Sequence, residues 1–223
     1  PAEETFVQVA AGYYHTIGIR ADGTAIAWGV DGDDVPAEET FVQVAAGFHY
    51  TIGLRADGTA LAWGWNDYGQ CNVPAEETFV QVAAGYYHTI GLRADGTALA
   101  WGYNNDGQCD VPAEETFVQV AAGALHTIGH RADGTALAWG DNGQDQCDVP
   151  VDETFMLVAS GGYHSIGLTG IPTGVCCVSS GCDVLTEDQC TNLGGSGILV
   201  GNCDDCAPAE PTGVCCVSSG CFA

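Results

Sequence analysis

The sequence contains no lysine and four arginines, against 29 aspartates and glutamates, for a net charge of −25 over 223 residues. So few cations are poorly suited to neutralising a phosphate backbone, and we predict that the chain does not bind nucleic acid. No apolar run reaches the roughly 20 residues that a membrane-spanning helix needs, so no membrane span is predicted. The strong negative charge favours solubility and suits a salty or cation-rich medium.

The sequence also lacks the common catalytic motifs. It has no G-x-S-x-G, no H-E-x-x-H and no glycine-rich phosphate loop. A pair of glutamates does recur, but a pair that appears in every repeat is typical of a solvated turn and not of a single glycosidase-like site. The pairs are Glu3-Glu4, Glu38-Glu39, Glu76-Glu77 and Glu114-Glu115. We predict that the chain is not an enzyme.

A repeat dominates what is present. The unit PAEETFVQVAAGYYHTIGLRADGTALAWGYNNDGQCDV at residues 74–111 recurs at 1–35, 36–73 and 112–149, and in a partial form at 150–168. A period of this length predicts an architecture in which each unit buries its apolar face against its neighbours. We therefore predict a repeat domain over 1–168, a linker at 169–172, a Cys-rich module at 173–211 and a truncated second copy of that module at 212–223.

Each unit has three segments with strand signals, and no segment has a helical period. In the third unit these are residues 79–82, 89–93 and 97–102. The dipeptide Asp95-Gly96 predicts a hairpin with a type I′ turn, in which both central residues have positive φ. The predicted fold class is all-β, with propeller-like blades of about three antiparallel strands and a small disulfide-rich C-terminal module. Four blades are complete and the fifth is partial; a β-solenoid is the second choice.

The string A-G-x-x-H-[TS]-I-G-L-x-x-D-G-T-x-x-x-W-G-x-N-x-x-G-Q resembles the repeat of the regulator of chromosome condensation family, over residues 1–168. The short period is most similar to the secreted bacterial branch, which includes a β-lactamase inhibitor protein. The resemblance implies a β-propeller, normally of seven blades. This chain departs from it, because the fifth unit lacks the D-G-T…W-G segment, which leaves ring closure open. The nuclear roles of the family are not expected at this charge.

The tail is rich in cysteine, and the string TGVCCVSSGC at 173–182 returns at 212–221. Dense cysteine in a segment too short for a core predicts a disulfide-stapled module, and hence an extracellular, secreted or cell-surface protein. Zinc is the weaker alternative, since the tail has one C-x-x-C and no histidine. The predicted disulfide cysteines, whose pairing stays open, are Cys176, Cys177, Cys182, Cys190, Cys203, Cys206, Cys215, Cys216 and Cys221.

Three more cysteines, Cys71, Cys109 and Cys147, hold equivalent positions in the repeats. The truncated tail copy also has an odd number of cysteines, so pairing within each set cannot be complete if the full module closes on itself. Two interpretations follow: these residues form cross-links to the tail or to another chain, or they are small buried side chains.

The repeats differ mainly in two columns, the two positions after A-A-G and the one after W-G. Equivalent positions in successive blades align in space, which predicts two stripes rich in aromatic residues. Such stripes suit a protein interface, because Tyr and Trp bury a large area at low entropic cost. The alternative is that they pack between blades. The binding candidates are Tyr13, Tyr14, Phe48, His49, Trp65, Tyr86, Tyr87 and Tyr103.

A column of histidines also recurs: His15, His88, His126 and His164, with Tyr50 in the second unit. We predict a structural hydrogen bond within each blade for this column, in preference to a metal or acid–base site. The acidic loops at 31–34 and 104–106 allow weak calcium binding but match no spaced calcium-loop motif, so no cofactor is predicted.

Two functions fit these patterns. The first is an extracellular structural protein that self-assembles into a filament or surface layer through open blade edges and the Cys-rich tail. The second is a secreted protein-binding module, inhibitor- or adhesin-like, that uses the aromatic stripes. The predicted partners are accordingly copies of the chain or another extracellular protein. The near-identity of the units makes self-assembly the preferred interpretation.

Overall fold

The computed structural model describes residues 4–30 and 35–169 and the backbone of four strands between residues 173 and 221. The chain divides into two compact units, Pro1–Thr169 and Gly170–Ala223. No helix in the described part of the chain has the length and hydrophobicity needed to cross a membrane.

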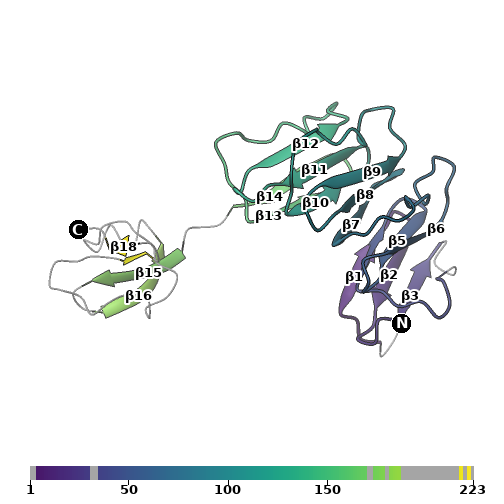
Figure 1. Ribbon diagram of the computed structural model, residues 1–223, viewed down its shortest axis with the longest axis horizontal. Helices are drawn as coiled ribbons and strands as arrows, with labels where there is room; N and C mark the ends of the chain where they lie inside the picture. The colour runs from purple at the N-terminus through teal and green to yellow at the C-terminus, as the bar shows by residue number, and fades with distance from the viewer. Residues whose placement is uncertain are drawn as a thin grey trace. The chain divides into compact units, whose positions relative to one another are not determined.

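The first unit consists of five antiparallel sheets that follow one another in chain order (Figure 1). Four have three strands and the fifth has two. The all-β prediction, with four blades and a partial fifth, is confirmed. The strands are β1 (Gln8–Ala11), β2 (His15–Ile19), β3 (Ala25–Gly29), β4 (Gln43–Ala46), β5 (Tyr50–Leu54), β6 (Ala60–Gly64), β7 (Gln81–Ala84), β8 (His88–Leu92), β9 (Ala98–Gly102), β10 (Gln119–Ala122), β11 (His126–His130), β12 (Ala136–Gly140), β13 (Leu157–Ser160) and β14 (Ser165–Leu168).

The hairpin between the second and third strands of each blade differs from the predicted type I′ turn. In blade 1 the Gly23 amide donates to the Arg20 carbonyl, and only Gly23 has a positive φ, of 86°. Asp22 keeps an ordinary φ because its carboxylate accepts hydrogen bonds from both the amide and the hydroxyl of Thr24. The turn therefore has a longer loop than predicted, with glycine alone in the left-handed region.

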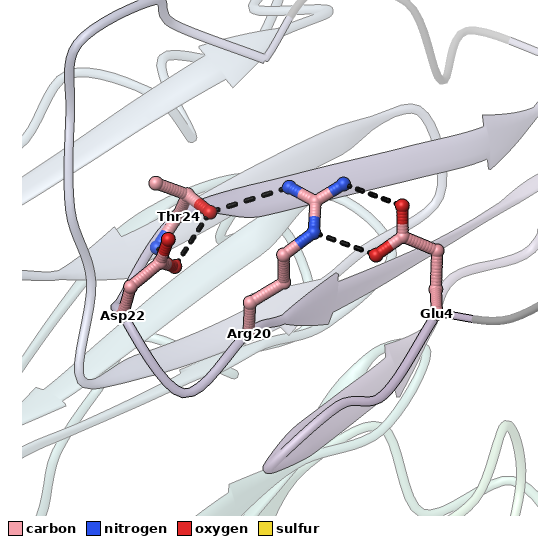
Figure 2. A network of polar contacts seen from close by, with 4 residues as sticks. All are labelled: Glu4, Arg20, Asp22 and Thr24. Atoms are coloured by element: carbon pink, nitrogen blue, oxygen red, sulfur yellow. Dashed lines mark hydrogen bonds and ion pairs between the residues drawn. The ribbon is translucent and has the colours of Figure 1, made fainter.

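The arginine of each repeat joins this hairpin to the start of its own blade. In Figure 2, the Arg20 guanidinium binds both carboxylate oxygens of Glu4, at 2.7 and 3.0 Å, and also donates to Thr24 Oγ1. The same pairing recurs in blades 2 to 4, as Arg55–Glu39, Arg93–Glu77 and Arg131–Glu115. All four arginines of the chain are thus ion-paired at the hairpin end of the blades.

The hydrophobic core lies between successive blades. Ile17 and Ile19 of blade 1 pack against Phe41 and Val44 of blade 2, and the alanines of both sheets fill the remaining space. Equivalent residues form the next two interfaces, with Ile52 against Val82 and Ile90 against Val120. Small side chains on one face of each sheet let the next sheet approach closely.

A polar contact and a close backbone approach fix the spacing of the inner strands β1, β4, β7, β10 and β13. A glutamine side chain on one inner strand hydrogen-bonds to the backbone of the next inner strand. Gln8 Nε2 donates to the Val44 carbonyl, and Gln8 Oε1 accepts from the Val44 amide. The second contact is a column of glycines at the strand ends. A Cβ on Gly85 would lie 2.6 Å from the carbonyl oxygen of Gly123 in the next blade, so only glycine permits this approach.

The first and fifth sheets each leave apolar side chains exposed. Val9 is 59 % exposed, whereas Val44 at the same position in blade 2 is 1 % exposed. At the other end, Ile166 and Leu168 are 56 % and 57 % exposed, while Ile90 and Leu92 are 0 % and 3 %. Each interior blade buries these positions against a neighbour, so within the described residues the stack of blades is open at both ends.

The second unit contains two hairpins, β15 (Thr173–Val178) with β16 (Gly181–Thr186) and β17 (Cys216–Val217) with β18 (Gly220–Cys221). Of the predicted disulfide cysteines, Cys190, Cys203, Cys206 and Cys215 lie outside the described residues, and the others lie on these strands, where the backbone alone is described. The disulfides therefore remain predictions.

Candidate functional site: an aromatic face

The two variable columns lie at one end of the blades because they are hydrogen-bonded to each other. His15 pairs with Gly29 across the β2–β3 ladder, and the next residue, Val30, donates its amide to the Tyr14 carbonyl. The same bond joins Trp65 to His49 and Tyr103 to Tyr87. Both columns thus lie opposite the Arg–Glu pairs, which occupy the hairpin end.

The predicted aromatic candidates form one continuous surface. Tyr13 contacts Phe48, whose ring contacts that of Tyr86 in the next blade, at centroid distances of 4.8 and 5.2 Å. The Tyr14 ring stacks on that of His49 at 4.5 Å. All eight candidates belong to this network. We call it the aromatic face: Tyr13, Tyr14, Phe48, His49, Trp65, Tyr68, Tyr86, Tyr87, Tyr103 and Tyr163.

Two members of the aromatic face are absent from the predicted set. Tyr68 lies in the loop after the second W-G and joins the rings of Tyr87 and Tyr103, at 5.3 and 4.9 Å. Tyr163 lies in the partial fifth repeat, at the position of Tyr87. The column alignment already contains the signal for Tyr163, whereas a single loop residue such as Tyr68 leaves no pattern across repeats.

The rings are accessible to a partner. Tyr13, Tyr68 and Tyr163 are 57 %, 46 % and 53 % exposed, so the rings do not simply fill the space between blades. Burial raises the pKa of Tyr86 and of Tyr87, and the neighbouring tyrosines raise it further. These phenols are therefore neutral. The face adjoins an axial cavity of about 240 Å³ that is lined mainly by glycines and alanines of the inner strands.

The comparisons with known proteins assign the repeat. The sequence profile of the regulator of chromosome condensation (RCC1) repeat matches residues 6–33, 41–70, 79–108 and 117–146. The chain belongs to the RCC1-repeat family. No curated protein sequence matches it.

Solved structures agree with this RCC1-repeat fold. The ectodomain of the receptor kinase CR4 from Physcomitrella patens is similar, with a TM-score of 0.66 and 23 % identity, over 79 % of this chain and 56 % of that one. The ectodomain of ACR4 from Arabidopsis thaliana gives 0.64 and 24 %, over 76 % and 64 %. Prp20p from Saccharomyces cerevisiae, described with its binding to Gsp1p and histones, gives 0.63 and 19 %, over 86 % and 59 %. The chain spans less than two thirds of each.

Three histidines of the column, His15, His88 and His126, hydrogen-bond to the next blade, whereas bonds within each blade were predicted. His88 Nε2 lies 3.0 Å from Thr127 Oγ1 of the next blade. Because the Thr127 hydroxyl donates to the Gln108 carbonyl, it must accept from His88, so Nε2 of the imidazole carries a proton. His88 Nδ1 is buried and has no hydrogen-bond partner among the described residues.

The other candidate positions hold local structure. Cys71, Cys109 and Cys147 are unpaired, half-buried thiols, each 3.3 Å from a backbone carbonyl oxygen. Burial raises the pKa of Cys109 to about 12, so its thiolate is scarce at neutral pH, which favours a packing role. Their cross-links remain a prediction.

The acidic loops likewise show local hydrogen bonding. Asn104 uses its side chain within its own loop, donating to Asp110 and accepting from the Cys109 amide, while residues 31–34 lie outside the described part. Among the described residues no group of three or more His, Cys, Asp or Glu side chains is placed to hold a metal ion. Weak calcium binding therefore stays a prediction.

The buried histidines make stability depend on pH. Burial is the main cause that lowers the pKa of His88 to about 3, and the nearby His126 contributes a smaller part. A folded-state pKa below the unfolded value of about 6.5 means that the stabilisation is complete above pH 6.5 and is lost as the pH falls. We expect His88→Tyr, which copies Tyr50, to reduce the slope of unfolding free energy against pH by roughly 1 kcal/mol per pH unit between pH 6.5 and 5.

Urea unfolding of both proteins at pH 7.5, 6.5, 5.8 and 5.0 measures this slope. Circular dichroism at pH 7.5 is the control for folding of the variant. Identical slopes for the two proteins would show that His88 does not titrate on unfolding and would contradict the assignment.

Proposed function

We propose that this RCC1-repeat chain is a protein-binding module and that the aromatic face is its binding surface. The observation that carries the proposal is the continuity of the face: rings from four of the five blades touch one another although they come from separate repeats. The repeats conserve their core within this chain and vary where the rings lie. A cluster of exposed Tyr and Trp suits the centre of a protein interface.

The charge distribution supports a basic partner. All four arginines are held in ion pairs at the opposite end of the blades, so the aromatic face presents none of them. Exposed Asp67 and Asp106 lie in the loops that follow the W-G positions, beside Tyr68 and Tyr103. Aromatic rings next to carboxylates bind Lys and Arg side chains through cation–π and charge contacts. The partner we propose is an extracellular protein with a basic surface, consistent with the predicted secretion of the chain.

We expect the triple variant Tyr13→Ser/Tyr14→Ser/Tyr68→Ser to lose binding to that partner by at least about 30-fold, because a hot-spot aromatic contributes about 2 kcal/mol or more. The full chain, immobilised, is exposed to the secreted proteins of the organism that makes it, and retained proteins are titrated for affinity. Binding should weaken with added salt.

The matched control is Val42→Ser/Val80→Ser/Val118→Ser, which removes three exposed apolar side chains at equivalent positions in three blades. This variant should bind like the wild type. Equal retention by the aromatic variant and the wild type would contradict the proposal.

Self-assembly is a second candidate function, favoured by the exposed ends of the stack. Val9 and the pair Ile166 and Leu168 are exposed only because no further blade covers them, and each end carries the side chains that meet in the interior interfaces. A head-to-tail contact between copies would bury both ends, and such a contact extends into a fibre if it does not close.

We expect the full chain to associate with rising concentration in sedimentation equilibrium, and Val9→Glu and Leu168→Glu each to weaken the association at least about tenfold by burying a charge. The control Val42→Glu should associate like the wild type. A monomer at all concentrations, with and without reductant, would remove self-assembly as a function and leave the aromatic face unaffected.

A further inference from the structure

One strand edge of the fifth blade is unpaired among the described residues. Blade 4 is built from β10, β11 and β12, whereas the described part of blade 5 consists of β13 and β14. The carbonyls of Leu168 in β14 and of His164, directly before it, accept from the amides of Met156 and Gly161, on the β13 side. Since backbone groups alternate in direction along a strand, those of Ser165 and Gly167 point to the outer edge, where no strand of the described residues pairs with them.

A cavity of about 300 Å³ lies beside this edge, between blades 4 and 5. Its lining includes Ile128, Gln146, Val149, Phe155, Val158 and Gly167. One repeat earlier, between blades 3 and 4, the equivalent residues surround a side chain of the third strand of blade 4.

The side chain that fills the equivalent space in blade 4 is that of Trp139. Its ring stacks on Phe117 at 5.6 Å and belongs to a cluster that contains Ile90, Val120 and Val111. Phe155, Ile128, Val158 and Val149 are the equivalents of those residues one repeat later, and all four line the cavity. The residues that line the cavity are therefore equivalent to those that surround Trp139 in blade 4.

The polar end of the site matches as well. The Gln108 carbonyl accepts two hydrogen bonds, from Thr127 Oγ1 and from the indole nitrogen of Trp139 at 3.0 Å. The equivalent Gln146 carbonyl accepts one among the described residues, from Ser165 Oγ. The Gln146 carbonyl oxygen has a second lone pair, which can accept a hydrogen bond from an indole N–H.

We propose that the outer edge of β14 is an acceptor site for one extended segment of a separate polypeptide. The segment pairs antiparallel with β14 and places a tryptophan in the cavity, so that it completes the fifth blade. The four W-G strands of this chain define its chemistry: small and large apolar residues alternate, as in A-L-A-W-G. Strand addition of this kind takes affinity from backbone hydrogen bonds and specificity from the side-chain pocket.

Residues 1–223 contain no fifth W-G segment that could supply this strand. The tryptophans of the W-G strands, Trp28, Trp63, Trp101 and Trp139, are each built into their own blade, and residues 170–223 contain no tryptophan. A second copy of the chain would have to release one of these strands from a finished sheet, with loss of its own stacking.

The test uses the full chain and a fluorescein-labelled peptide with the sequence of residues 133–141, DGTALAWGD. We expect saturable binding by fluorescence anisotropy, at least about tenfold weaker binding when the peptide Trp is replaced by Ala, and a similar loss when its Leu is replaced by Pro, which removes a ladder amide. Hydrogen exchange should slow at the amides of Ser165 and Gly167 when the peptide is added.

The Tyr13→Ser/Tyr14→Ser/Tyr68→Ser variant changes no residue of β14 or of the cavity lining and should bind the peptide like the wild type, which keeps this test independent of the aromatic face. Absence of binding up to 1 mM peptide, on the order of the weakest specific affinities, would overturn the proposal. So would equal binding of the Trp→Ala peptide, or protection outside β14. If the chain self-associates and the added peptide dissociates the oligomer, a second copy of the chain fills the site. This result would overturn the assignment to a separate polypeptide.

Discussion

The close approach of the inner strands at a column of glycines is the constraint on which the rest of the structure depends. Gly12, Gly47, Gly85 and Gly123 each face the carbonyl of the corresponding glycine one blade later, at distances from a built Cβ of 2.4 to 2.7 Å. The imidazole or phenol of the same blade packs on that glycine from the other side, 2.8 Å or less from the built Cβ. With no side chain at this position, the blades are close enough for each glutamine to reach the next inner strand and for the isoleucines to bury fully.

That fixed stacking separates the chemistry of the two ends of the blades. The hairpin ends carry the Arg–Glu pairs and are nearly identical from blade to blade, while the opposite ends carry the variable columns. Since stacking brings equivalent positions together, a few aromatic substitutions in separate repeats produce one continuous surface. The RCC1-repeat core thus acts as a scaffold, and the proposed binding surface lies where the repeats differ. The fifth blade departs differently, by losing a strand and gaining a cavity.

Much of this was predictable from the sequence, and the remainder depended on contacts between repeats. Alternation and the D-G turns predict the three strands of each blade, and column variation predicts eight rings of the aromatic face. The direction of the His88 hydrogen bond was not predictable, because its partner Thr127 lies in the next blade. His130 stands where the other repeats have leucine or isoleucine, and its Nε2 lies 2.8 Å from the Phe155 carbonyl oxygen, in the partial repeat. Its partner is 25 residues away along the chain, so the contact emerges only from the packing of one repeat on the next.

The most direct test of this account is the free energy of unfolding of Gly85→Ala in the full chain, measured by urea titration beside Gly143→Ala. A Cβ at Gly85 would meet the Gly123 carbonyl at 2.6 Å and the His88 ring at 2.3 Å, whereas one at the exposed Gly143 meets only the Asp141 carboxylate at 3.2 Å. The account predicts a loss of about 2 kcal/mol or more for Gly85→Ala and less than about 0.5 kcal/mol for Gly143→Ala. Equal, small losses would show that the glycine column does not set the blade spacing and would contradict the account.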